Sequence, residues 1–237
     1  MPAGQRRRRR RVARRVNRPA LSLAHVTVTL GGRDVVRDAS VDFARGTATV
    51  VVGRSGAGKS VLLKAAAGLL PRSAGRVVVH APPLVFVHQD PALLDDRSVL
   101  DNVLLPAAVA GVDDREALRR AAAALLGRLG LHAVAALRPA RLSPSQARRA
   151  ALARALLLRP GVLIVDEPTT GLDPDSAADV DAALLDVVDA DRAVVVVTHH
   201  PRTLACLRAL PDASVVVVDQ GRVLPAGEPA AAAGATA

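Results

Sequence analysis

Three observations predict an α/β fold with a mostly parallel sheet, an antiparallel β region and an inserted helical subdomain. In the second half of the chain, short runs of valine and other apolar residues alternate with helical patterns, which is typical of parallel strands buried on both faces. Near the beginning, two extended segments flank Gly31 and Gly32, a pair typical of a turn. From about residue 90 to residue 159, the strand pattern disappears and helical patterns remain.

The first half of the chain should form mainly strands. They are expected at residues 21–30, 35–43, 47–52, 76–80 and 84–87, because these segments are apolar or alternate between apolar and polar residues. A helix at residues 59–70 should interrupt this series. It should end in the cluster of proline, serine and glycine at residues 70–75, since these residues break helices.

Two helix starts are expected within the inserted subdomain. Asp113 and Glu116 have the spacing of a capping box, with Asp113 as the N-cap residue. Ser143, Pro144 and Gln146 suit the N-cap, the first helical position and the reciprocal cap of a second helix that runs to about residue 158. Apolar residues at helical spacing follow the first start and should face the core: Leu118, Ala122, Leu125, Leu126 and Leu129.

The rest of the chain returns to alternating strands and helices. Strands are expected at residues 162–165, 193–198 and 214–219, and helices at residues 174–189 and 202–210. These elements predict one domain at residues 20–227. An arginine-rich tail at residues 1–19 and a low-complexity tail at residues 228–237 should flank it.

Composition excludes several classes of protein. Of the 237 residues 50% are apolar, yet no run reaches the ~20 apolar residues of a membrane-spanning helix. Cys206 is the only cysteine, which excludes an internal disulfide and a cysteine zinc cluster. The net charge is +10, and residues 1–18 hold nine arginines and no acid, so the remainder carries 10 − 9 = +1. This tail should be disordered and could attract anionic lipid or nucleic acid, or be an extension without function.

Residues 53–60 fit the phosphate-binding pattern G-x-x-x-x-G-K-[ST] and predict a P-loop NTPase (RecA-like) core. Glycines let backbone N–H groups converge on phosphate oxygens, and the following helix N-terminus adds partial positive charge. Lys59 should reach the β- and γ-phosphates, and Ser60 should hold Mg²⁺. The residues expected to bind the nucleotide here are Gly53, Arg54, Ser55, Gly56, Ala57, Gly58, Lys59, Ser60 and Val61.

Two carboxylates, Asp166 and Glu167, end the apolar strand expected at residues 162–165. Burying an acidic side chain within a strand costs free energy, whereas the carboxyl edge of a parallel sheet faces the ligand crevice. Asp166 should therefore bind Mg²⁺, directly or through water, and Glu167 should act as a general base toward water. Taken alone, the pair could also be an acidic loop after a strand.

Six motifs in the same order resemble those of the nucleotide-binding subunit of ABC transporters, and the resemblance covers about residues 20–227. They resemble that family's Walker A loop (53–60), Q-loop (86–89), signature (142–146), Walker B strand (162–169), D-loop (171–173) and switch histidine (197–199).

The resemblance implies ATP and Mg²⁺ as cofactors and hydrolysis in a head-to-tail dimer, where one protomer's signature helix completes the other's site. It implies that Gln89 senses the metal and the attacking water, and that His199 donates to the γ-phosphate. Either residue on its own would more often be structural. The remaining residues implied to contact nucleotide are Ser143, Ser145, Gln146 and Asp173.

Two features depart from the family pattern. The signature L-S-G-G-Q is here Leu142-Ser143-Pro144-Ser145-Gln146. Pro144 lacks an N–H, and the side chain of Ser145 is expected to crowd the opposing γ-phosphate and weaken hydrolysis. Leu30 aligns where an aromatic residue usually stacks on adenine, so weaker base affinity and a relaxed preference for ATP are expected.

The leading hypothesis is an ATPase subunit bound, as a homodimer or heterodimer, to an integral membrane transporter subunit on the cytoplasmic face of the plasma membrane. Residues 92–103 resemble the matching stretch of cell-division, lipoprotein-release and phospholipid-trafficking ATPases. A nucleotide-gated scaffold with little hydrolysis is a second hypothesis, motivated by the altered signature. The arginine-rich tail motivates a third, a soluble ABC-type ATPase acting on nucleic acid. Nucleic acid is the less expected partner because the tail lies outside the domain.

Overall fold

A computed structural model of the protein describes residues 19–109, 111 and 114–224. Most of the expected N-terminal tail, Asp113 and the expected C-terminal tail lie outside these residues. Pro19, expected in the tail, instead begins the first strand. No helix of the described residues is long and apolar enough to cross a membrane.

The antiparallel region that the sequence predicted is a three-stranded sheet. Strands β1 (Pro19–Leu30), β2 (Arg33–Ala44) and β4 (Ala74–Val79) pair in the order β2-β1-β4. β1 is antiparallel to both neighbours, and Gly31 and Gly32 form the turn between β1 and β2. Apolar residues at alternate positions, including Val26 and Val28, are fully buried, which explains why the period-2 pattern predicted these strands.

The central sheet contains six strands in the order β5-β6-β7-β3-β8-β9. They are β3 (Ala48–Val52), β5 (Leu84–Val87), β6 (Val162–Asp166), β7 (Ala193–Val197), β8 (Ser214–Asp219) and β9 (Arg222–Val223). Neighbouring strands are parallel except for β8 and β9. Every residue of β6 and β7 is buried, so their continuous apolar runs reflect burial on both faces of the sheet.

Six α-helices and two short 3-10 helices (His132–Val134 and Pro139–Arg141) complete the described fold. The α-helices are α2 (Lys59–Ala66), α3 (Val99–Val109), α4 (Arg115–Arg128), α5 (Pro144–Leu157), α6 (Pro174–Asp186) and α7 (Pro201–Arg208). The helix expected at residues 59–70 ends earlier, since Gly68 takes a positive φ of 75°. The expected N-cap Asp113 is wrong, because Asp114 caps α4 by accepting from the N–H of Ala117, 2.9 Å away. Glu116 instead pairs with Arg120 one turn later.

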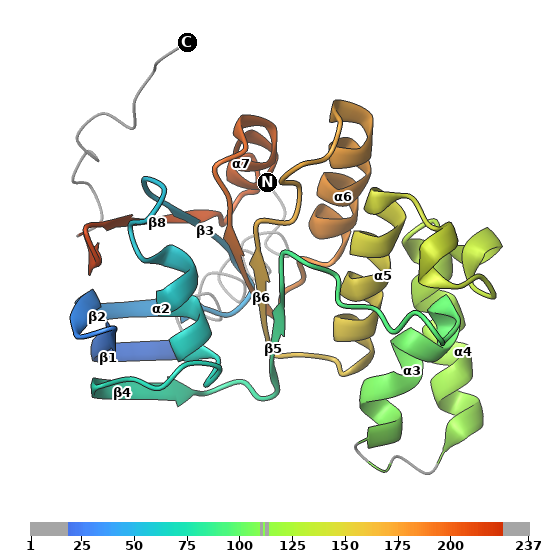
Figure 1. Ribbon diagram of the computed structural model, residues 1–237, viewed down its shortest axis with the longest axis horizontal. Coiled ribbons are helices and arrows are strands. Elements are labelled where there is room, and N and C mark those ends of the chain that lie inside the picture. Colours follow the sequence, from blue (N-terminus) through green and yellow to red (C-terminus); the bar gives the residue numbers. More distant parts are fainter. Residues whose placement is uncertain (1–18, 110, 112–113, 225–237) are drawn as a thin grey trace, which may run out of the picture.

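The helices and sheets form layers with two hydrophobic cores. Figure 1 shows the antiparallel sheet and α2 on one side of the central strands, α5 and α6 on the other, and α3 and α4 farthest out. Alternate residues of β6 belong to different cores. Val162 and Ile164 pack with β1, β2 and α2, whereas Leu163 and Val165 pack with α3 to α6. The central sheet is thus covered on both faces. The edge formed by the carboxyl ends of its parallel strands remains for a ligand.

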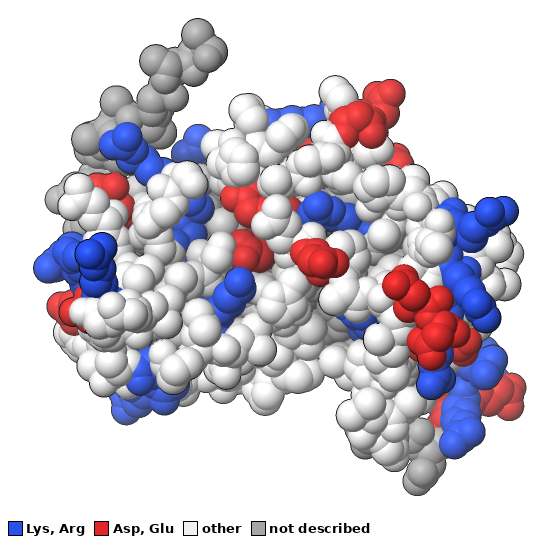
Figure 2. Space-filling model, viewed as in Figure 1, with Lys and Arg blue, Asp and Glu red and all other residues white. Residues whose placement is uncertain are grey.

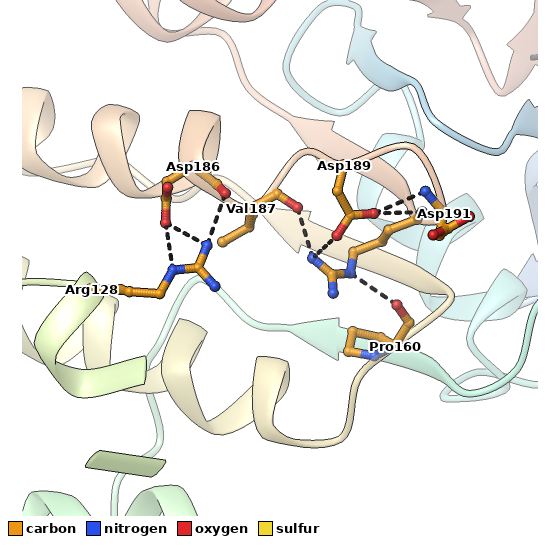
Figure 3. A network of polar contacts seen from close by, with 7 residues as sticks. Arg128, Pro160, Asp186, Val187, Asp189 and Asp191 are labelled. Carbon is orange, nitrogen blue, oxygen red and sulfur yellow. Dashed lines mark hydrogen bonds and ion pairs between the residues drawn. The ribbon is translucent and has the colours of Figure 1, made fainter. Parts of the chain in front are cut away.

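Arginines join the helical insertion and the loop before β7 to this framework (Figure 3). Arg128 of α4 donates to the Asp186 carboxylate at the end of α6, at 2.7 Å. Arg192, just before β7, donates to the carbonyl oxygens of Pro160 and Val187 at 2.9 and 2.7 Å and pairs with Asp189. Arg192 thus links the residue that precedes β7 to the loop that precedes β6.

Candidate nucleotide-binding site

The phosphate loop joins β3 to α2 and depends on glycine at two close approaches. Gly53 and Gly58 have φ angles of 154° and 99°. A Cβ atom on Gly53 would lie 2.0 Å from the carbonyl oxygen of Val218, and one on Gly58 would lie 2.8 Å from that of Val35. Larger residues would therefore displace the loop from the strands that support it.

Two backbone hydrogen bonds hold the loop in place, one within the loop and one from a distant part of the chain. The N–H of Ala57 donates to the carbonyl of Arg54 at 3.1 Å, and the N–H of Gly221 donates to the carbonyl of Ala57 at 2.9 Å. Gly58 is the N-cap of α2, and among the described residues no side chain caps this helix. The first N–H groups of α2 thus remain available to an anion, as the sequence predicted.

Lys59 lies folded over the loop and is only 8% exposed. Its Nζ atom donates to the carbonyl oxygens of Gly53 and Arg54 at 2.9 and 3.0 Å. A buried ammonium needs such partners, and phosphate oxygens above the loop would be stronger ones because they carry charge. The predicted contact of Lys59 with the β- and γ-phosphates stays a prediction, and the position of the ammonium over the loop is compatible with it.

Ser60 and Asp166 meet beside the loop, although 106 positions separate them. The Ser60 hydroxyl donates to the Asp166 carboxylate at 2.8 Å. Burial raises the pKa of Asp166, while the hydrogen bond from Ser60 and the charges of Lys64 and His88 partly oppose this shift. A hydroxyl and a carboxylate are the donors that Mg²⁺ takes beside phosphate oxygens, so the pair fits this ion. No cluster of three or more His, Cys, Asp or Glu residues that could hold a metal occurs among residues 19–109, 111 and 114–224.

Glu167 and His199 form a second pair at the same edge. The Nδ1 atom of His199 lies 2.8 Å from one carboxylate oxygen of Glu167, and the hydroxyl of Thr170 donates to the other at 3.0 Å. Glu167 has a positive φ of 46°, an uncommon conformation for a residue other than glycine. Its side chain is 14% exposed and that of His199 67%, so the carboxylate is sheltered next to an accessible imidazole.

Gln89 and Asp173 are less closely joined to this cluster. Gln89 is exposed two positions after Val87, which pairs with Val165 of β6, so it lies at the same edge of the sheet. Within the described residues its side chain has no hydrogen-bond partner. Asp173 is the N-cap of α6, and hydrogen bonds from Ser176 lower its pKa. The structure thus gives Asp173 a helix-capping role.

The signature segment forms the N-terminus of α5 with the predicted capping box. The N–H of Ser143 donates to the Gln146 side chain at 2.9 Å, and the N–H of Gln146 donates to the Ser143 hydroxyl at 3.2 Å. Ser145 is only 3% exposed, so its side chain packs within the protomer. This inward packing argues against the expected crowding of an opposing phosphate by this side chain, which stays a prediction. Figure 1 shows α5 and the P-loop helix α2 on opposite sides of β6, so the two do not meet within one protomer.

Charges of both signs gather at the centre of this face. Figure 2 shows acidic and basic side chains next to one another above the ends of β5 and β6. Sequence reasoning missed two contributors to this region, Thr170 and Arg148. Arg148 donates from α5 to the carbonyl oxygens of Glu167, Pro168 and Thr170. No short motif marks either residue, because each acts through contacts that only the fold creates.

A glycine loop at a helix N-terminus, a buried lysine and an acidic strand end define a P-loop nucleotide-binding protein. The family model described as "ABC transporter" matches residues 36–170, more than half of the chain. The chain belongs to the ABC transporter family, in which its place is that of an ATP-binding cassette.

Relatives agree with this assignment. The lipoprotein-releasing system ATP-binding protein LolD of Maricaulis maris is 39% identical over 78% of this chain and 87% of its own length. The aliphatic sulfonates import ATP-binding protein SsuB 2 of Streptomyces avermitilis is 37% identical over 88% of this chain and 80% of its own length.

Solved structures share the fold. The dimeric structure of MJ0796, a bacterial ABC transporter cassette, has 25% sequence identity and a TM-score of 0.75, covering 86% of this chain and 97% of that one. The structure of cbiO1 from Clostridium perfringens, part of the ABC transporter complex cbiONQ, has 25% identity and a TM-score of 0.74, covering 87% of both chains. The predicted P-loop core with mixed strands and a helical insertion is confirmed.

Proposed function

We propose that this chain binds ATP with Mg²⁺, hydrolyses it within a dimer of cassettes and thereby drives transport through a membrane partner. The observation that carries the proposal is the meeting of two pairs at one sheet edge. Ser60 bonds to Asp166 beside the phosphate loop, and Glu167 bonds to His199. Ser60, the adjacent residues Asp166 and Glu167, and His199 come from three separate parts of the sequence, and the two carboxylates bind different partners. A structural role alone does not account for this convergence.

The arrangement suits phosphoryl transfer to water. Lys59 and the first N–H groups of α2 would hold the β- and γ-phosphates, and Ser60 and Asp166 would hold the metal ion, which offsets phosphate charge. Glu167 would accept the proton of a water molecule as its oxygen bonds to the γ-phosphorus and the bond to the bridging oxygen breaks. His199 would orient the Glu167 carboxylate and donate to the γ-phosphate, and ADP and phosphate would leave.

Hydrolysis requires a second protomer in this proposal. The N-terminus of α5 lies away from the P-loop of its own chain (Figure 1), so it would complete the site of another copy or of a related cassette. Ser145 would offer its backbone N–H there, Pro144 has none to give, and Ser143 and Gln146, whose N–H groups are engaged in the capping box, would contact the nucleotide through other atoms. Asp173 would approach the same interface from the N-terminus of α6.

The partner and the location follow from the same reasoning. The LolD and SsuB relatives carry the names of a lipoprotein-releasing system and of an importer. A polypeptide that spans the membrane would bind the helical subdomain near residues 92–103. The cassette would then act at the cytoplasmic face of the plasma membrane.

Calorimetry with Mg·ATP, together with phosphate release, tests the proposal. Saturable binding that Lys59→Ala abolishes, and turnover that Glu167→Gln abolishes while binding persists, are the expected results. Absence of binding in the wild-type protein would refute the assignment of the site. Co-purification from membranes with a polytopic protein tests the transporter role.

A nucleotide-gated scaffold is the second candidate, favoured by Pro144 and by the engagement of Gln146 in the capping box. Calorimetry together with phosphate release also distinguishes the two functions. A scaffold would bind Mg·ATP and turn it over no faster than Glu167→Gln does.

A further inference from the structure

Arg148 links α5 to the segment that follows β6. Its Nη1 atom donates to the carbonyl oxygens of Glu167 and Pro168 at 2.9 and 3.2 Å, and its Nη2 atom donates to that of Thr170 at 2.8 Å. One guanidinium thus binds three carbonyls within four residues. The planar fork of arginine can span such a set, whereas the single ammonium of lysine cannot do so at once.

These contacts fix a backbone that would otherwise relax. A non-glycine residue at positive φ is strained and persists only where its surroundings hold it. Glu167, at φ 46°, is held on one side by its own N–H, which donates to the Val197 carbonyl at 2.9 Å. Arg148 holds the other side through the Glu167 carbonyl. The direction of the carboxylate therefore depends on both bonds.

The surroundings of Arg148 act on its charge in two opposite ways. Burial lowers its pKa, and the charge of Asp90 acts in the opposite direction. Asp90 directly follows Gln89, and Arg148 lines a small cavity together with His88, Pro91 and Pro168. Arg148, near the beginning of α5, therefore lies close to the carboxyl ends of β5 and β6.

We propose that Arg148 is a positioning residue, which aims the Glu167 carboxylate and couples it to the N-terminus of α5. This proposal rests on the proposed function, in which a second protomer's nucleotide binds at that helix end. A shift of α5 on dimer closure would move the three carbonyls that Arg148 binds. The hydrolytic geometry of one protomer would then respond to the nucleotide held by the other.

Paired substitutions on one helix test the idea. Arg148→Met removes all three bonds with little change in helix propensity. Arg148→Lys restores a positively charged donor group but not the planar fork of the guanidinium. Arg149→Met is the matched control, because Arg149 is also partly buried but donates to the Leu129 carbonyl and to Asp179, at 2.8 and 3.1 Å, outside the site.

We expect Arg148→Met to lower kcat roughly ten- to a hundred-fold, because small misplacements of catalytic groups have effects of this order. The Kd for Mg·ATP should not change, since the phosphate loop is untouched. Arg148→Lys should give an intermediate kcat, and Arg149→Met should turn over like the wild type. Wild-type turnover in Arg148→Met, or an equal loss in Arg149→Met, would overturn the proposal.

Amide hydrogen exchange separates this proposal from the proposed function. In Arg148→Met, the amides of residues 169–172 should exchange faster while the amides of the phosphate loop do not change. If the wild-type chain has no turnover that depends on Lys59, the proposed function fails, yet exchange still decides whether Arg148 holds the segment. Unchanged exchange at residues 169–172 would refute the positioning role by itself.

Discussion

Asn102 offers a sharp test of how the helical subdomain is stabilised. The residue is fully buried in α3, and its side chain bonds to the loop that precedes the helix. Its oxygen accepts from the N–H of Leu94 at 2.7 Å. Its nitrogen donates to the carbonyls of Leu94 and Ser98, each at 3.0 Å, and to that of Arg97 at 3.4 Å. The substitution Asn102→Ala removes all of these bonds.

The expected loss follows from the three shorter bonds. Each contributes about 1 kcal/mol net, so Asn102→Ala should lower the free energy of unfolding by roughly 3 kcal/mol. In a chain of this size such a loss corresponds to a fall in Tm of roughly 6–12 °C. Urea and thermal denaturation measure the two quantities.

Asn102→Asp is the control because it keeps the acceptor for Leu94 and loses the donors. It should also be destabilised, since it buries a charge, whereas Mg·ATP affinity should stay unchanged in both variants. If the loop is the docking surface proposed for the membrane partner, stimulation by that partner should fall. A loss of stability below about 1 kcal/mol for Asn102→Ala would refute the reasoning, because it would mean that the bonds contribute no more than exposed ones.

Three further predictions concern the site itself. Burial raises the pKa of Asp166 above its ordinary value of 3.8, so the folded state holds this proton more tightly than the unfolded state does. The stability contributed by the protonated carboxyl should be full at pH values below 3.8 and be lost as the pH rises through the higher pKa of the folded state. Asp166→Asn should abolish this part of the pH dependence of unfolding, and an unchanged profile would argue against it. Gly53→Ala should unfold at clearly lower urea concentration and lose Mg·ATP binding, because its Cβ would lie 2.0 Å from the carbonyl oxygen of Val218; wild-type binding by calorimetry would contradict this. His199→Ala should reduce kcat by about 10²-fold with little change in Kd, since it releases the carboxylate of Glu167; a phosphate-release assay that shows wild-type turnover would assign His199 a structural role only.

Much of the fold could be predicted from local patterns, for physical reasons. The valine run of β7 is buried on both faces, and a strand in that position has few alternatives. The start of α5 was predictable because Ser143 and Gln146 satisfy each other within four residues. The phosphate loop was predictable because its function requires glycines and a lysine at fixed spacing.

Other features depend on contacts that no local pattern contains. The cap of α4 shifted from Asp113 to Asp114, since adjacent aspartates are equally good N-caps and packing selects between them. The inward packing of Ser145 depends on how α5 lies against its neighbours. Arg148 was missed because its partners, at residues 167–170, lie across a gap that only the tertiary structure closes.

The support of the phosphate loop by Gly221 has a consequence for how the protein is made. The N–H of Gly221 is bonded to the Ala57 carbonyl, so the loop needs a residue that is synthesised more than a hundred positions later. A nascent chain cannot complete its nucleotide pocket until residue 221 has left the ribosome. In the function proposed above, ATP would therefore be bound in full only late in synthesis, after this hydrogen bond has formed.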